Sequence, residues 1–164
     1  MMKYLLVVSL TLIPLLAAPA PGRAQEESFD TFLSRFDYEM REEMKIDSKG
    51  LIPLLLSGKA VLVDIRFNEE VAAWRMGFGL AIPLNELPKR LQELPKDKLI
   101  VTACPHKDRS AIAMAYLRSK GFEARYLTDG LLGLAESLRG DRARDFAEET
   151  GMLDNKLPLA NPSH

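Results

Sequence analysis

The sequence predicts an α/β fold in which a mostly parallel sheet is flanked by helices. Continuous apolar runs at residues 60–64 and 99–103 are typical of buried parallel strands, and a third strand is expected at 122–127, after Gly121. Segments with helical spacing of apolar residues separate these strands, and such alternation favours a parallel sheet. A chain of 164 residues with 47% hydrophobic and 27% charged content is sufficient for one globular core.

The first 24 residues are typical of an export signal. Lys3 is followed by a mostly apolar run over residues 4–20, which Pro14 interrupts and which ends in small residues. A membrane-spanning helix needs about 20 apolar residues, more than this run contains. We expect cleavage after Ala24 and an exported, periplasmic or secreted domain without stable membrane insertion; an uncleaved N-terminal anchor is the alternative.

Residues 25–47 predict an N-terminal amphipathic helix that covers part of the domain, because apolar side chains recur at helical spacing among charged ones. The further helices and strands follow from apolar periodicity and from Gly and Pro boundaries. In chain order, the expected elements are helix 48–56, strand 60–64, helix 69–75, helix 85–94, strand 99–103, helix 110–120, strand 122–127, helix 131–138 and helix 141–150, with a loose tail to residue 164.

Charge and metal-ligand spacing exclude several classes of function. The formal net charge is −1, and no basic block or mixture of basic and aromatic residues points to nucleic acid or to an anionic membrane surface. Cys104, His106 and the distant His164 do not have the spacing of a zinc site, so we expect no metal and no cofactor.

Cys104 is the only cysteine of the chain. An exported domain with one cysteine cannot form an internal disulfide, so its thiol is either a small buried hydrophobe or a group kept for chemistry. Cys104 directly follows the strand at 99–103, and ligands of open α/β sheets bind at the carboxyl ends of strands. The polar and charged residues that follow it favour a sulfur atom at a surface loop, and therefore a catalytic nucleophile.

The loop from Cys104 to Ser110 contains groups that suit a thiolate and an anionic substrate. Its backbone N–H groups precede a helix and lack helical partners, and Lys107 and Arg109 add positive charge, all of which favours the thiolate. Arg109 is suited to a bidentate contact with a sulfonate or similar oxyanion. Ser110 is expected to hydrogen-bond the loop or the sulfur.

Two loop residues have weaker roles in this interpretation. His106 is either a general base or, as we favour, a residue at the mouth of the site, since a thiolate activated by cations and a helix N-terminus needs no base. We expect Asp108 to be structural.

The sequence resembles the rhodanese-like domain family over about residues 48–138, and we expect the family domain to span residues 48–140. The resemblance is carried by short motifs along the chain, of which the last three in the following list are the most specific. They are Leu62-Val63-Asp64-Ile65-Arg66, Glu69-Glu70, Ala81-Ile82-Pro83-Leu84, Leu94-Pro95-Lys96-Asp97-Lys98, Ile100-Val101-Thr102-Ala103-Cys104, Arg109-Ser110 and Gly121-Phe122. Residues 141–164 would form a C-terminal helix and loose tail outside the family domain.

The resemblance implies a sulfurtransferase that takes sulfane sulfur from a donor such as thiosulfate, holds it as a persulfide on Cys104 and passes it to a thiophilic acceptor. The amides of residues 106–110 would stabilise the persulfide, whereas Pro105 has no N–H to offer. Asp64 and Arg66 would be scaffold residues near the end of the sheet. The expected partners are small sulfur-containing anions, and a protein sulfur donor or acceptor is a further candidate.

Two alternatives remain. Pro105 stands where the family commonly has Arg or Lys, and no glycine lies between Cys104 and Arg109; these departures suggest a sulfur carrier or binding module that turns over poorly with small donors. A phosphatase or arsenate reductase is the other alternative. Related phosphatases place five residues between cysteine and arginine, whereas four separate Cys104 from Arg109 here, and the smaller ring suits a sulfur atom.

Overall fold

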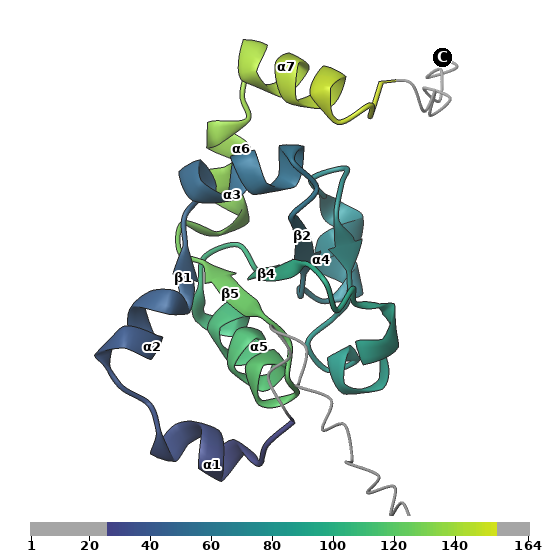
Figure 1. The fold of residues 1–164 in the computed structure, drawn as a ribbon. Coiled ribbons are helices and arrows are strands. Elements are labelled where there is room, and N and C mark those ends of the chain that lie inside the picture. Colours follow the sequence, from purple (N-terminus) through teal and green to yellow (C-terminus); the bar gives the residue numbers. More distant parts are fainter. Residues whose placement is uncertain (1–25, 154–164) are drawn as a thin grey trace, which may run out of the picture.

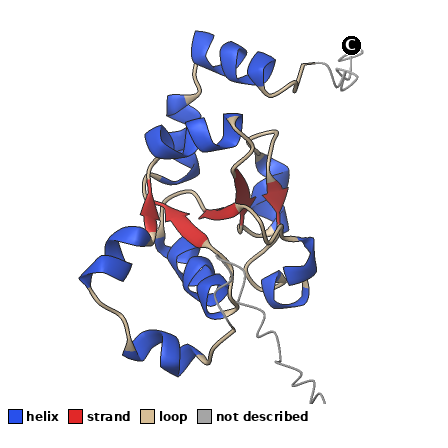
Figure 2. Cartoon of the chain, viewed as in Figure 1, coloured by secondary structure: helices blue, strands red, loops and turns tan. Residues whose placement is uncertain are grey.

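The computed structural model describes residues 26–153, in which a five-stranded sheet lies between helices (Figure 1; Figure 2). This architecture confirms the predicted α/β fold class. The helices and strands are α1 (Phe29–Ser34), α2 (Tyr38–Glu43), β1 (Lys45–Ile46), α3 (Ser48–Leu56), β2 (Ala60–Asp64), α4 (Asn68–Ala73), β3 (Leu80–Ala81), β4 (Leu99–Ala103), α5 (Asp108–Ser119), β5 (Ala124–Leu127), α6 (Gly130–Ser137) and α7 (Asp141–Glu149).

The sheet has the strand order β1-β5-β4-β2-β3, and all four pairings are parallel. The central strand β4 is buried at every residue, as its continuous apolar sequence predicts. β2 pairs with β4 in a register that sets Asp64 beside Ala103. The segments that follow β2 and β4 therefore leave the sheet at the same edge.

Two hydrophobic clusters cover the two faces of the sheet. On one face α5 contributes Ala113, Met114 and Leu117 to a cluster that also contains Cys104. On the other face Leu51 of α3 packs with Leu131 and other residues of α6. Figure 1 shows α5 on the opposite side of the strands from α3 and α6. The sheet therefore has apolar contacts on both sides, which a parallel sheet requires.

The N-terminal segment differs from the single amphipathic helix expected over residues 25–47. It forms two short helices, α1 and α2, followed by the strand β1, which pairs with β5. The physical reason lies at Asp37, whose backbone is extended and whose side chain accepts a hydrogen bond from the Met40 N–H, so that a new helix starts there. Phe32 and Met40 are buried, whereas Phe29 is about half exposed.

Other expected boundaries also differ. The helix expected at 85–94 is replaced by two 3₁₀ turns, Leu87–Lys89 and Leu91–Glu93. Pro88 lacks the N–H that an α-helix would need at that point. The helix expected from Ser110 begins two residues earlier, so Arg109 lies in the first turn of α5. The short edge strands β1 and β3 were not predicted, because two residues are too few to show a periodic pattern.

The C-terminal helix α7 joins the domain through an aromatic contact. Phe146 is buried, and its ring centroid lies 5.0 Å from that of Phe78.

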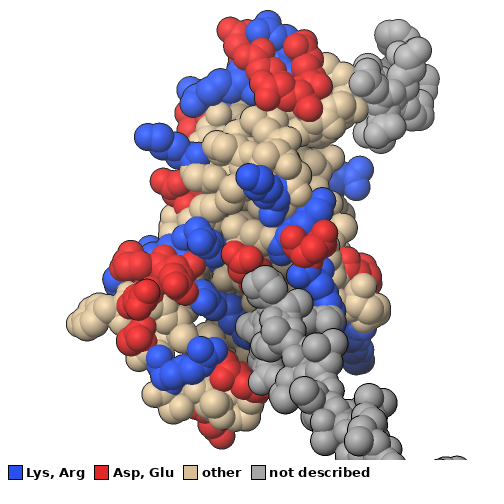
Figure 3. Space-filling model, viewed as in Figure 1, with Lys and Arg blue, Asp and Glu red and all other residues tan. Residues whose placement is uncertain are grey.

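Positive and negative side chains are interspersed over the face shown in Figure 3. Among residues 26–153, every helix is too short or too polar to cross a membrane. The expected export signal (1–24) and the tail beyond residue 153 lie outside the described residues.

Candidate active site

Cys104 lies immediately after β4, in the loop that leads into α5. Because β4 is flanked by β2 and β5, the loop emerges at the middle of the carboxyl edge of the sheet. This is the place where a parallel sheet gathers ligand-binding loops. The structure thus brings the predicted nucleophile and the first turn of a helix together within six residues, 104–109.

The sulfur of Cys104 is buried, which corrects the prediction of a sulfur atom exposed at a surface loop. Cys104 has 0% exposure and belongs to the core cluster under α5, while His106, Lys107 and Asp108 are exposed. The charged sequence after Cys104 correctly predicts an exposed loop, but the side chain of Cys104 itself lies beneath that loop. Cys104 Sγ is 3.7 Å from Asp108 Oδ1 and 3.8 Å from Ser110 Oγ.

The backbone N–H groups of the loop are available to a ligand. In the described part of the chain, no hydrogen bond is assigned from the N–H groups of residues 106–110, and the first N–H to join the helical pattern is that of Ala111, which donates to Lys107 O. Unpaired N–H groups at the start of a helix favour negative charge. Five such donors in the loop that follows Cys104 can stabilise an anionic form of its sulfur.

Two hydroxyl groups hold the loop on the sheet. The Ser110 hydroxyl donates to Lys107 O at 2.9 Å, and the Thr102 hydroxyl donates to Ser110 O at 2.8 Å. Both Ser110 and Thr102 are fully buried. Thr102 lies on β4, so the start of α5 is tied to the strand that carries Cys104. This confirms the predicted hydrogen bond from Ser110 to the loop.

The start of α6 supports the loop from the other side. Leu131 N–H donates to Cys104 O at 2.8 Å, and Leu132 N–H donates to Pro105 O at 3.4 Å. Gly130 has a φ of +64°, and a Cβ atom built there would lie 2.2 Å from His106 O and 2.3 Å from Pro105 O. Only glycine allows this approach without displacing the loop.

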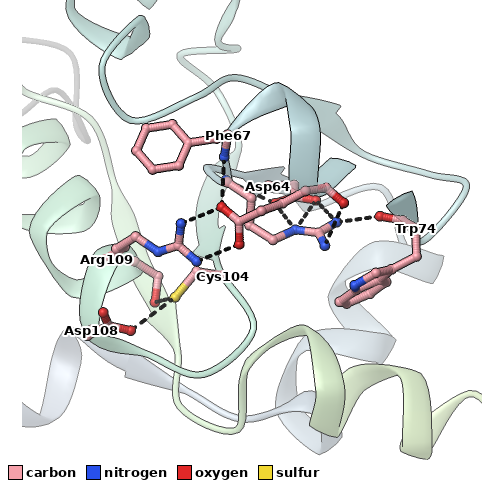
Figure 4. Close-up of polar contacts among 9 residues, drawn as sticks. Asp64, Phe67, Trp74, Cys104, Asp108 and Arg109 are labelled. Carbon is pink, nitrogen blue, oxygen red and sulfur yellow. Dashed lines mark hydrogen bonds and ion pairs between the residues drawn. The ribbon is translucent and has the colours of Figure 1, made fainter. Parts of the chain in front are cut away.

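Arg109 is bound to Glu70 of α4. Its Nη1 donates to Glu70 Oε2 at 2.6 Å and its Nη2 donates to Glu70 Oε1 at 2.9 Å (Figure 4). The hydrogen bonds from Arg109 lower the pKa of Glu70 to about 2, and Glu70 raises the pKa of Arg109. The sequence predicted a free guanidinium for an oxyanion; the structure instead gives Arg109 a carboxylate of the protein.

A second ion pair, between Asp64 and Arg66, stabilises the edge of the sheet near the loop. Arg66 is fully buried, and its Nη2 donates to Asp64 Oδ2 at 2.6 Å and to Trp74 O at 2.8 Å. Its guanidinium carbon lies 4.0 Å from the centre of the Trp74 ring. Arg66 therefore connects β2 to the segment after α4, as expected of a scaffold residue.

Comparison with known proteins agrees with this geometry. The family model for the rhodanese-like domain matches residues 51–137, which is more than half of the chain. The chain belongs to the rhodanese-like domain family.

Named relatives of this rhodanese-like domain include sulfurtransferases. A sulfurtransferase of Allochromatium vinosum is 38% identical over 79 residues, which cover 48% of this chain and 74% of the relative. The putative sulfurtransferase YtwF of Bacillus subtilis is 31% identical over 71 residues, which cover 43% of this chain and 69% of that protein. The structure of the human single-domain sulfurtransferase TSTD1 is similar with a TM-score of 0.52 and 30% identity, over 57% of this chain and 96% of that one.

Sequence reasoning missed two residues of the rhodanese-like site. Glu70 was noted only as part of a family motif at the start of a helix, yet its carboxylate binds Arg109. Gly130 was not assigned a role, yet α6 approaches the loop through it. The one available signal in the sequence was the place of Glu70 in the family motif Glu69-Glu70. Among residues 26–153, no three His, Cys, Asp or Glu side chains come together in a way that could hold a metal ion.

Proposed function

We propose that this chain is an exported sulfurtransferase that carries sulfane sulfur as a persulfide on Cys104. The observation that carries the proposal is the position of Cys104 under a loop whose N–H groups, from residues 106–110, have no assigned partner in the described part of the chain. Membership of the rhodanese-like family and the names of its relatives support the same chemistry.

The transfer consists of two balanced displacements. The Cys104 thiolate attacks the outer sulfur of a donor such as thiosulfate; the S–S bond of the donor breaks, and sulfite leaves with the bonding electron pair. An acceptor, either cyanide or a thiolate, then attacks the terminal sulfur of the persulfide and restores the Cys104 thiolate. Loop N–H groups stabilise the anionic persulfide between the two steps. Neither step needs an external oxidant.

The separation of Cys104 and Arg109 favours sulfur transfer over phosphate chemistry. Four residues lie between them, and the loop that they enclose is held on both sides by β4 and α6. Arg109 is also bound to Glu70, which lowers its capacity to grip a tetrahedral dianion. A small sulfur atom on Cys104 needs no such grip.

The activity is tested by incubating the purified protein with thiosulfate and cyanide and measuring thiocyanate. We expect formation of thiocyanate by the wild type and none above background by Cys104→Ser, whose circular dichroism should be unchanged. Equal thiocyanate formation by both proteins would refute the role of Cys104.

One observation favours the second candidate, a sulfur carrier with slow turnover. Cys104 has 0% exposure, so a small donor reaches the sulfur only after the side chains above it move. Mass spectrometry after treatment with polysulfide separates the two functions. A stable mass increase of one sulfur atom on Cys104, without thiocyanate release in the presence of cyanide, would indicate the carrier.

Export is proposed on the sequence of residues 1–24 alone. Expression of the full chain in a bacterial host, followed by isolation of the periplasmic fraction and N-terminal sequencing, tests it. A product that begins at Gln25 is expected. Recovery of only the full-length chain in the membrane fraction would indicate the uncleaved anchor instead.

A further inference from the structure

The mouth of the site has less positive charge than its sequence suggests. Lys107 and Arg109 supply two cations, but Glu70 binds the Arg109 guanidinium through both of its carboxylate oxygens. Asp108 then places a second carboxylate next to the sulfur, with Oδ1 at 3.7 Å from Cys104 Sγ. Counting these four side chains, the mouth is neutral before the thiolate forms and carries one negative charge afterwards.

Asp108 has a carboxylate that contacts the reacting atom, Cys104 Sγ. Among residues 26–153 its side chain has no assigned ion pair, and its assigned side-chain contact is with Cys104 Sγ. Electrostatic repulsion is proportional to the charge of the approaching group. A donor with two negative charges is therefore repelled by Asp108 about twice as strongly as a donor with one, at equal distance.

Phe67 adds an apolar surface at the same mouth. Its side chain is 49% exposed, and its ring centre lies 5.8 Å from the guanidinium carbon of Arg109. Figure 4 shows the Phe67 ring and Asp108 flanking Arg109 in this view. A donor with an organic group can bury apolar surface on this ring, whereas thiosulfate has no apolar group to bury.

We propose that Asp108 and Phe67 make Cys104 select singly charged organic donors of the thiosulfonate class over the dianion thiosulfate. This inference rests on the proposed sulfurtransferase function and names its preferred substrate class. The Cys104 thiolate attacks the terminal sulfur of the thiosulfonate; the S–S bond breaks, and a sulfinate leaves with the electron pair. Charge balances, since a thiolate and a thiosulfonate give a persulfide anion and a sulfinate.

The test compares kcat/KM for benzenethiosulfonate and for thiosulfate, with cyanide as the acceptor and thiocyanate as the readout. We expect the wild type to prefer benzenethiosulfonate. Asp108→Asn should raise kcat/KM for thiosulfate about tenfold, which corresponds to about 1.4 kcal/mol, and for benzenethiosulfonate about threefold. The matched control is Asp97→Asn, because Asp97 is exposed at the opposite end of β4 and loses the same charge.

Phe67→Ala provides an independent second variant. It should lower kcat/KM for benzenethiosulfonate about fivefold, with kcat/KM for thiosulfate within twofold of the wild type. The reason is that only the organic donor has an apolar group that can contact the ring.

The possible outcomes separate the inference from the function on which it rests. Sulfur transfer from neither donor to wild-type Cys104 would overturn the sulfurtransferase function and the inference together. Transfer with an unchanged donor ratio in Asp108→Asn and in Phe67→Ala would overturn the inference alone. An equal loss with both donors in Asp108→Asn would also overturn it, because Asp108 would then serve the transfer itself.

Discussion

Substitution of Gly130 by alanine should damage the active-site loop from a distance. Gly130 opens α6, and a Cβ atom there would lie 2.2 Å from His106 O, 2.3 Å from Pro105 O and 2.8 Å from His106 Cα. All three contacts are with backbone atoms, so no side chain can rotate away to relieve them. Either α6 or the loop must move.

The expected loss in the free energy of unfolding of Gly130→Ala has two parts. The φ of +64° costs a residue with a Cβ atom about 1 kcal/mol relative to glycine. Overpacking in a well-packed region adds about 1–3 kcal/mol. We therefore expect Gly130→Ala to lower the free energy of unfolding by about 3 kcal/mol, and to reduce sulfur loading of Cys104 because the displaced carbonyls of Pro105 and His106 belong to the loop.

Gly58→Ala is the matched control. Gly58 has nearly the same φ, +66°, but no atom lies within 4 Å of the Cβ position. The free energy of unfolding of Gly58→Ala should therefore fall only by the cost of the backbone conformation, about 1 kcal/mol, and sulfur loading of Cys104 should be unchanged. Urea denaturation followed by circular dichroism, together with mass spectrometry of persulfide on Cys104, measures both quantities. Equal stabilities and equal loading of the two variants would refute the argument that α6 holds the loop through Gly130.

Two further predictions concern the ion pairs. Arg66→Met leaves the Asp64 carboxylate with little solvent and without its guanidinium, and should lower the free energy of unfolding by about 3–5 kcal/mol in urea denaturation. The double variant Asp64→Leu/Arg66→Met should be less destabilised, since no charge is left unpaired; a larger loss would contradict this reason. Glu70→Gln should lower the free energy of unfolding by about 1 kcal/mol at neutral pH, because the pair with Arg109 is partly exposed. Since folding lowers the pKa of Glu70 from 4.5 to about 2, this contribution is complete above pH 4.5 and is lost as the pH falls towards 2. Acid titration of the stability of Glu70→Gln and of the neighbouring control Glu69→Gln checks it, and a wild-type advantage that does not change over this range would count against the pair.

Sequence alone determined the fold class and the place of Cys104. The mostly apolar runs at 60–64 and 99–103 became β2 and β4, because a strand buried on both faces needs apolar residues at most of its positions. Cys104 directly follows one of these runs, so its position at the edge of the sheet followed from local order. The helix after it was also expected, although it starts two residues earlier than predicted.

Tertiary structure decided the surroundings of the sulfur. Glu70 lies 39 residues before Arg109 in the chain, and no local pattern shows that α4 brings its carboxylate to the guanidinium. The burial of Cys104 likewise depends on how the exposed loop, α5 and α6 pack over it. A local pattern reports which residues are apolar or charged, whereas the partner of each charge depends on which distant segments meet. The prediction of a cationic loop after Cys104 therefore placed Lys107 and Arg109 correctly in the chain but missed the carboxylate that binds Arg109.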